Sequence, residues 1–93
     1  MATKHINAST LTTASILFTV DPNARPLTPV NIHNGHSAAI FIGDASITTS
    51  GATIGRTIAA GANQILYVYA NDVIYGISAA ASATGAIVMT YSA

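Results

Sequence analysis

Short apolar runs recur along this chain, and residues typical of turns separate one run from the next. The runs are rich in Ile, Val, Thr and Tyr, whose β-branched or aromatic side chains favour strands over helices. Turn signals such as Asn34-Gly35 and Asn71-Asp72 lie between them. The candidate strands are Lys4–Ser9, Ser15–Val20, Val30–His33, Ala38–Ile42, Ile47–Thr49, Arg56–Ala59, Gln64–Ala70, Val73–Ser78 and Ala86–Tyr91.

This spacing predicts an all-β fold. Short strands that recur about every ten residues are typical of sandwiches and small barrels. We therefore expect a small antiparallel β-sandwich or a jelly-roll-like barrel of eight to nine short strands. One segment, Ser78–Gly85, contains four Ala and leaves a helix open as the alternative. Its Ser, Thr and Gly residues favour a hairpin loop instead.

Two candidate strands, Ala38–Ile42 and Gln64–Ala70, are apolar on both faces. In Gln64–Ala70, Leu66 and Val68 alternate with Ile65, Tyr67 and Tyr69, so neither face of the strand is polar. A strand with one solvated face should instead alternate apolar with polar residues. Tyr is a common anchor of protein interfaces. The candidate residues for a subunit or shell interface are Phe41, Tyr67, Tyr69, Tyr75 and Tyr91. The alternative is that the tyrosines are amphipathic residues at the edge of the core.

The chain length fits one domain, within which the first 29 residues differ from the rest. Pro26 and Pro29 keep their stretch extended and poor in ladder hydrogen bonds. We expect residues 1–29 to form an N-terminal arm or an added hairpin, and residues 30–93 to form the sandwich core.

Charge is scarce along the whole chain. Only three cationic and three acidic residues occur among 93, and the net charge is zero, whereas about a quarter of a typical soluble domain is charged. A surface with so little charge is best tolerated when other subunits cover it. Three scattered cations argue against a nucleic-acid partner, which needs a basic face. The apolar runs are too short for a membrane partner.

The sequence offers little chemistry for a catalytic or metal site. His33 and His36 form a His-x-x-His pair on a turn, but no Cys or Glu lies nearby, and this spacing outside a helix has low specificity. No Gly-x-Ser-x-Gly elbow and no phosphate-binding loop occurs. We expect no enzyme activity, no catalytic or metal-ligating residues and no cofactor.

Several segments follow one another in an order that suggests a family. They are Val30-Asn31-Ile32-His33-Asn34, Ala39-Ile40-Phe41-Ile42-Gly43, Ile47-Thr48-Thr49, Ile58-Ala59-Ala60-Gly61-Ala62, Ile74-Tyr75-Gly76-Ile77-Ser78 and Ala86–Met89. Their order and spacing resemble a family of small β-sandwich virion proteins of tailed bacteriophages. The resemblance covers about two-thirds of the chain, and the first 29 residues do not contribute to it.

The resemblance implies a structural role in a virion and no catalysis. We expect a capsid decoration or cement protein that stabilises the head shell, located at the capsid surface. Its partners would be further copies of itself, as a homotrimer by family analogy, and the major capsid protein or other virion proteins. The alternative is a tail, collar or fibre component, which could be a glycan-recognition module whose tyrosines stack on sugar rings.

Overall fold

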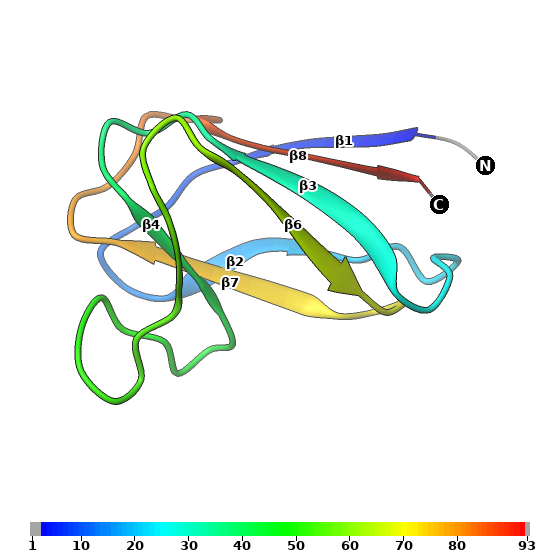
Figure 1. The fold of residues 1–93 in the computed structure, drawn as a ribbon, viewed down its shortest axis with the longest axis horizontal. Helices are drawn as coiled ribbons and strands as arrows, with labels where there is room; N and C mark the ends of the chain where they lie inside the picture. Colours follow the sequence, from blue (N-terminus) through cyan, green and yellow to red (C-terminus); the bar gives the residue numbers. More distant parts are fainter. Residues whose placement is uncertain (1–2, 93) are drawn as a thin grey trace.

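The structure is a computed structural model that describes residues 3–92. Residues 3–92 contain eight β-strands and no helix. The strands form two four-stranded antiparallel sheets that pack face to face (Figure 1). They are β1 (Thr3–Ala8), β2 (Ser15–Thr19), β3 (Thr28–Asn34), β4 (Ile40–Gly43), β5 (Arg56–Ile58), β6 (Asn63–Val68), β7 (Val73–Ser78) and β8 (Ile87–Ser92).

The strand order is that of a jelly roll. One sheet has the order β1-β8-β3-β6 and the other β2-β7-β4-β5. The first strand therefore pairs with the eighth, the second with the seventh, the third with the sixth and the fourth with the fifth. A long hairpin folded over into two sheets produces this arrangement, which is the double-sheet jelly roll. The expected all-β fold is confirmed, with eight strands.

Two segments, Ser78–Gly85 and Ile47–Thr49, show where the strand predictions hold and where they fail. The loop interpretation of Ser78–Gly85 is confirmed, because only Ser78 belongs to a strand. The strand expected at Ile47–Thr49 is wrong. Thr48 forms one isolated bridge with Ile54, and its backbone bonds remain inside the loop between β4 and β5. The Thr48 hydroxyl donates to the carbonyl of Ser50, so this segment satisfies its polar groups locally instead of joining a sheet.

The N-terminal segment belongs to the sandwich itself. β1 pairs along its whole length with β8, and β2 pairs with β7 in the other sheet. The expected division at residue 29 therefore separates strands that share both sheets. β1 and β2 do not form a hairpin with each other, because they lie in different sheets.

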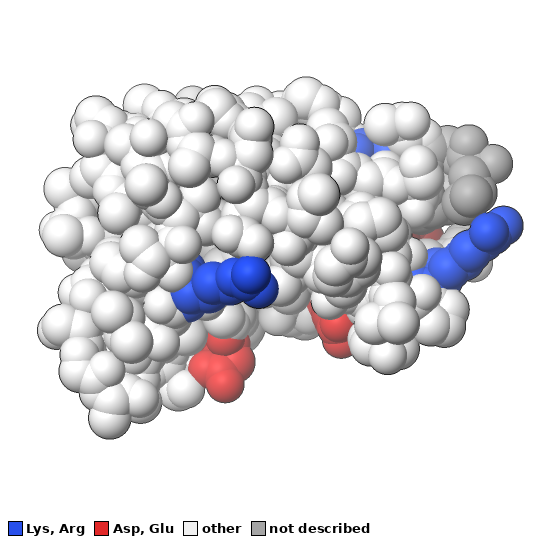
Figure 2. All heavy atoms as spheres, in the orientation of Figure 1, with Lys and Arg blue, Asp and Glu red and all other residues white. Residues whose placement is uncertain are grey.

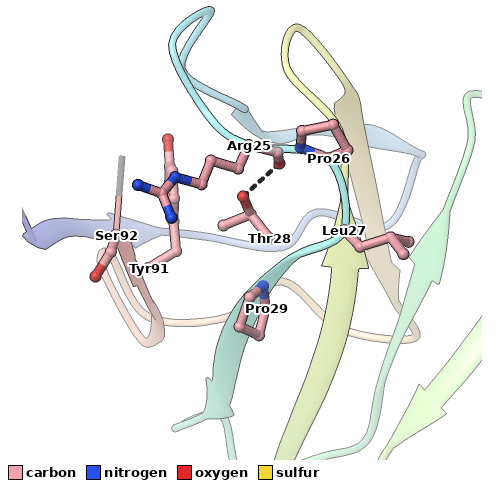
Figure 3. A pocket seen from close by; sticks show the side chains of 7 residues that line it. All are labelled: Arg25, Pro26, Leu27, Thr28, Pro29, Tyr91 and Ser92. Carbon is pink, nitrogen blue, oxygen red and sulfur yellow. Dashed lines mark hydrogen bonds between the residues drawn. The ribbon is translucent and has the colours of Figure 1, made fainter. Parts of the chain in front are cut away.

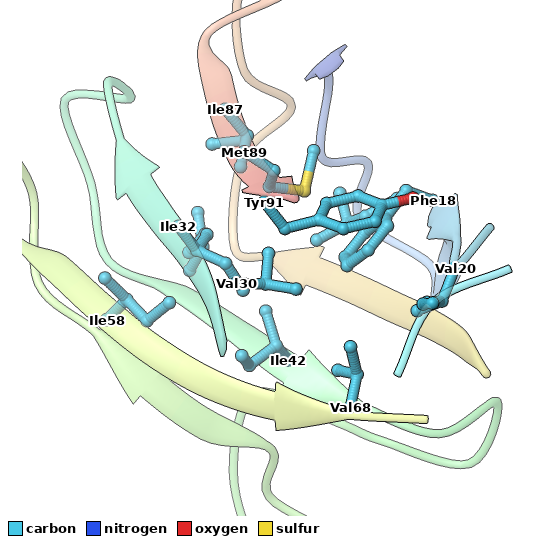
Figure 4. Packing of buried hydrophobic residues seen from close by; sticks show 13 residues of the cluster. Phe18, Val20, Val30, Ile32, Ile42, Ile58, Val68, Ile87, Met89 and Tyr91 are labelled. Atoms are coloured by element: carbon cyan, nitrogen blue, oxygen red, sulfur yellow. The ribbon is translucent and has the colours of Figure 1, made fainter. Parts of the chain in front are cut away.

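The core lies between the sheets and is almost entirely aliphatic. Val30, Ile32, Ile87 and Met89 are each fully buried within it (Figure 4). Ile40 is fully buried there too. At one end the rings of Phe18 and Tyr91 lie 6.1 Å apart and are tilted by 41°. A β-bulge in β2 turns the consecutive residues Leu17 and Phe18 both toward the core.

Asn34 is a buried polar hub at the end of β3. Its side-chain amide nitrogen donates to the carbonyls of Ala38, at 3.0 Å, and Ile58, at 2.9 Å. Its side-chain oxygen accepts from the backbone N–H of His36 at 2.9 Å. These bonds fix the loop before β4 and the end of β5 to the end of β3. The next residue is Gly35, and a Cβ there would clash with the carbonyl oxygen of Ala86, so the tight turn excludes any side chain.

The hydroxyls of Ser15 and Ser78 are both buried at the inner face of the β2-β7-β4-β5 sheet, but within residues 3–92 only that of Ser78 has hydrogen-bond partners. The Ser78 hydroxyl lies 2.8 Å from Thr10 Oγ1 and 2.6 Å from the carbonyl of Ala80. The Ser15 hydroxyl oxygen is buried and has no partner among the described residues. An unpaired buried hydroxyl costs stability, whereas a paired one adds to it.

Replacing Ser15 with alanine is therefore expected to stabilise the protein. The Ser15→Ala variant should gain about 1 kcal/mol in the free energy of unfolding, because it removes a buried polar atom that has no partner. Ser78→Ala is the matched control and should lose about 1–2 kcal/mol. Urea unfolding of both variants checks the signs, and a destabilised Ser15→Ala would show that this hydroxyl is satisfied.

Candidate interaction surfaces

The molecular surface carries very few charged groups. The chain exposes 4859 Å² and holds six charged residues. Figure 2 shows one face, on which isolated basic and acidic side chains stand apart in a continuous uncharged surface. The composition predicted this surface, and the fold decides where its apolar parts gather.

The three aspartates each bond to the backbone of a turn. The carboxylate of Asp21 accepts a hydrogen bond from the backbone N–H of Asn23, that of Asp44 from Ser46, and that of Asp72 from Tyr69, at 2.8–2.9 Å. Such bonds are the usual role of Asp in turns.

One aspartate also takes part in an ion pair. Lys4 Nζ lies 3.2 Å from Asp21 Oδ2, which is the only ion pair among residues 3–92. The pKa of Asp21 is lowered, first by the bond from the Asn23 backbone and then by Lys4. The pKa of Asp44 is lowered by the Ser46 hydroxyl and then by the Ser46 backbone N–H.

These lowered pKa values predict that stability falls in acid. A carboxyl whose pKa is lower in the folded state stabilises the protein above its unfolded pKa of about 4, and this contribution is lost as the pH falls through the folded pKa. We expect Asp21→Asn to make the melting temperature less dependent on pH below about pH 4. Calorimetry across this range measures the slope, and an unchanged slope would contradict the role of Asp21.

The outer face of the β2-β7-β4-β5 sheet is apolar. Its strand positions include Ile16, Phe41, Val73, Tyr75 and Ile77, which we call the apolar face. Ile16 lies opposite Tyr75 and Phe41 opposite Ile77 in the strand register. Ile16 is 55% exposed and Val73 40% exposed.

The strand β7 contributes three of the large apolar side chains on this face. A Cβ on Gly76 would lie 2.7 Å from Leu17 Cδ1, so Gly76 faces the core. Because side chains alternate along a strand, Ile74 and Ser78 face inward with it, and the larger row of Val73, Tyr75 and Ile77 faces outward. Ile77 is only 7% exposed, yet it lies outside the core cluster.

The loop between β4 and β5 folds back beside the apolar face. A Cβ on Gly43 would lie 2.6 Å from the side chain of Ile47, which places Ile47 against Gly43. Gly43 lies opposite Tyr75 in the register and therefore on the same outer face. Ile47 is 8% exposed and, like Ile77, is not a member of the core cluster. In Figure 1 this loop, drawn in green, extends beyond the second sheet.

The predicted interface residues fall into three groups. Phe41 and Tyr75 are half-buried on the apolar face. Tyr67 and Tyr69 are 63% and 51% exposed, with Tyr67 on the outer side of β6 in the other sheet. Tyr91 was wrongly placed at the surface: it is 6% exposed and packs in the core. Its hydroxyl accepts the backbone N–H of Asp21 at 3.0 Å, which satisfies the one polar atom of a buried ring.

Ile16, Val73 and Ile77 lie on the apolar face but are not among the residues predicted from the sequence. The large side chains of Val73–Ser78 alternate with smaller ones, so the pattern alone favours placing the large row in the core. Only Gly76 indicates in the sequence that this larger row faces outward, because the missing side chain leaves room for Leu17 on the core side.

The two histidines of the His-x-x-His pair make separate contacts. His33 Nδ1 lies 2.7 Å from Asn63 Oδ1, and His36 Nε2 lies 3.0 Å from the carbonyl of Ala80. Among residues 3–92, no group of three His, Cys, Asp or Glu side chains is placed to hold a metal ion.

A cleft of about 380 Å³ lies at the end of the sandwich near Tyr91. Its lining consists of Arg25, Pro26, Leu27, Thr28, Pro29, Tyr91 and Ser92 (Figure 3). The Arg25 side chain supplies the one charged group, and the Thr28 hydroxyl donates to the Arg25 carbonyl. These residues include no carboxylate or imidazole, so the cleft lacks a paired acid and base.

A second hollow, of about 360 Å³, lies beside the loop between β4 and β5. Asp44 and Arg56 both line it, but the Asp44 carboxylate is already bonded to the Ser46 hydroxyl at 2.6 Å. Arg56 forms no ion pair within the described part of the chain. The hollow is a product of the loop's turn and offers no second carboxylate.

No helix in the described residues is long and apolar enough to cross a bilayer.

No protein-family model matches this sequence, and neither the curated proteins nor the solved structures include a significant match. The resemblance to phage virion proteins therefore stays an expectation from the sequence, and the function is proposed from the surface.

Proposed function

We propose that this protein is a structural subunit of a tailed-bacteriophage virion, most specifically a decoration or cement protein of the head shell. The apolar face is the observation that carries the proposal. The β2-β7-β4-β5 sheet turns Ile16, Val73 and Tyr75 outward, whereas an antiparallel sheet that faces water normally turns polar residues outward. Such a surface is typical of one that another protein covers.

Two further observations support the proposal. Six charged residues on the whole chain leave little electrostatic repulsion between neighbouring copies or against a shell. The jelly-roll order of the strands recurs in viral capsid domains and in lectins. Fold alone does not assign function, so the weight rests on the face and on the resemblance.

In this proposal the protein stabilises the shell mechanically. The apolar face would dock on the major capsid protein or a neighbouring virion protein, and the buried area would add binding free energy to the shell against internal DNA pressure. The loop at Ile47 lies beside this face and would contribute to the same contact. The proposal requires several copies on one particle, and a homotrimer is the form that the resemblance implies.

Binding to particles that lack the protein tests the proposal. Heads from a phage deleted for this gene are mixed with the purified protein and sedimented, and the bound protein is quantified. We expect saturable binding at a fixed ratio of copies to shell subunits, and heads that resist heat or chelator better once bound. Absence of the protein from purified wild-type virions would overturn the proposal.

A glycan-recognition module is the second candidate, and exposed aromatic rings favour it. Tyr67 and Tyr69 are more than half exposed, and rings of this kind stack on sugars. Neither tyrosine lines either of the two hollows described above. Binding to a glycan array together with no binding to heads would select this function instead.

A further inference from the structure

The two sheets have four edge strands, and three of them carry features that discourage pairing with another chain. β1 holds Lys4, whose side chain lies on the core-facing side of the edge and pairs with Asp21. β2 is interrupted by a bulge between Ile16 and Phe18. β5 has three residues and begins with Arg56. An inward charge, a bulge and a short charged strand are all features that prevent edge-to-edge association.

The fourth edge, β6, has none of these features. It is six residues long, it contains no charge and no proline, and its register with β3 is regular. Ile65 and Tyr67 on its outer side are 50% and 63% exposed. An uncharged and regular edge strand with exposed apolar side chains is a template for pairing with another strand.

The backbone groups at this edge can be assigned to residues. The Gln64 side-chain amide donates to the Ile65 carbonyl at 3.3 Å, which indicates that this carbonyl faces away from β3. In an antiparallel strand, alternate residues point both their N–H and C=O to the same side. Ile65 and Tyr67 therefore point their backbone groups to the free edge, while Gln64 and Leu66 bond to β3. The Gln64 side chain must release the Ile65 carbonyl when a partner strand pairs there.

The strand is also complementary to itself. If two copies of β6 pair antiparallel about a two-fold axis at Leu66, Ile65 of each copy lies opposite Tyr67 of the other. Ile65 and Tyr67 then exchange backbone hydrogen bonds, and each aromatic ring meets a β-branched side chain, which is a favourable cross-strand pair. No charged residue of β6 opposes a like charge, because the strand has none.

We infer that the β6 edge pairs with the β6 edge of a second copy of this chain, so that two four-stranded sheets join into one of eight strands. The contact is isologous and closes as a dimer. Because the contact is confined to one strand edge of each copy, we expect it to bury less than the roughly 800 Å² per partner of a standard stable interface, and we expect a dissociation constant in the micromolar to millimolar range. This inference does not depend on the virion role, and its two-fold symmetry differs from the three-fold arrangement that the family resemblance implies.

Sedimentation equilibrium of the purified protein from about 1 µM to about 1 mM tests the pairing. We expect the average mass to rise from the monomer value of 9.4 kDa toward that of a dimer. Ile65→Lys places a charge at the centre of the pairing and should raise the dissociation constant tenfold or more. Hydrogen exchange should show the Ile65 and Tyr67 amides becoming slower as concentration rises.

The matched control is His5→Lys, which adds the same charge to the outer face of the same sheet at the opposite edge. It should leave the dissociation constant unchanged. Tyr67→Lys serves as the second variant if circular dichroism shows that Ile65→Lys is unfolded. A protein that stays monomeric throughout, a plateau at the mass of a trimer, or an equal effect of His5→Lys would each overturn the inference.

Discussion

The Asn34→Ala variant is expected to lose about 4 kcal/mol of unfolding free energy and to melt roughly 20 °C below the wild type. The side chain is fully buried and joins two carbonyls and one backbone N–H. Alanine leaves the carbonyls of Ala38 and Ile58 without this donor, and each buried group that loses its partner costs about 1–3 kcal/mol. For a domain whose total stability is of the order of 5–15 kcal/mol, this is a large fraction.

Asn31→Ala is the control for this prediction. Asn31 lies on the same strand, but it is exposed on the outer face, where its amide can bond to water. We expect its substitution to change the unfolding free energy by less than about 0.5 kcal/mol. Equal losses in the two variants, measured by urea or thermal unfolding, would show that the buried bonds of Asn34 do not hold the loop and β5 in place.

The Ile16→Lys variant is expected to remain folded and to bind phage heads that lack this protein about a hundredfold more weakly than the wild type does. Ile16 is 55% exposed on the apolar face, so lysine there is solvated in the free protein. In the proposed complex the ammonium group would be buried without a partner, and a loss of about 3 kcal/mol corresponds to a hundredfold in affinity. Co-sedimentation over a series of protein concentrations measures the ratio.

His5→Lys again supplies the matched charge, now on the opposite sheet. It should bind heads as the wild type does, because the outer face of the β1-β8-β3-β6 sheet does not contact the shell in the proposed complex. If His5→Lys weakens binding and Ile16→Lys does not, the docking face has been assigned to the wrong sheet.

Local patterns in the sequence determine most of the strands. Val73–Ser78 was predicted with its observed bounds, and the alternation of Leu66 and Val68 with Ile65 and Tyr67 divides β6 into its inner and outer rows. These predictions succeed because β-branched runs and turn residues act over a few positions. The turn roles of the aspartates follow from the same short-range chemistry.

The placement of side chains relative to the core could not be predicted in the same way. Alternation separates two rows of a strand but does not say which row is inside when both are apolar. Tyr91 is in the core and Tyr75 outside it because of long-range pairings, such as β1 with β8 and β2 with β7, that no local pattern encodes. The bulge that turns both Leu17 and Phe18 inward depends in the same way on the partner strand.

The two proposed contacts use different sheets. The apolar face belongs to the β2-β7-β4-β5 sheet, and the unprotected β6 edge belongs to the other sheet. A copy docked through its apolar face would therefore keep its β6 edge free for a neighbour. Weak pairing of this kind gains strength when many copies are held on one particle, because each contact then becomes effectively intramolecular.

An electron cryomicroscopy reconstruction of heads with the protein bound would show whether the apolar face docks on the shell. We expect an ordered density for the sandwich on the shell, with Ile16, Val73 and Tyr75 turned toward the capsid protein. A reconstruction without this density, or one in which the apolar face is turned to solvent, would contradict the proposal.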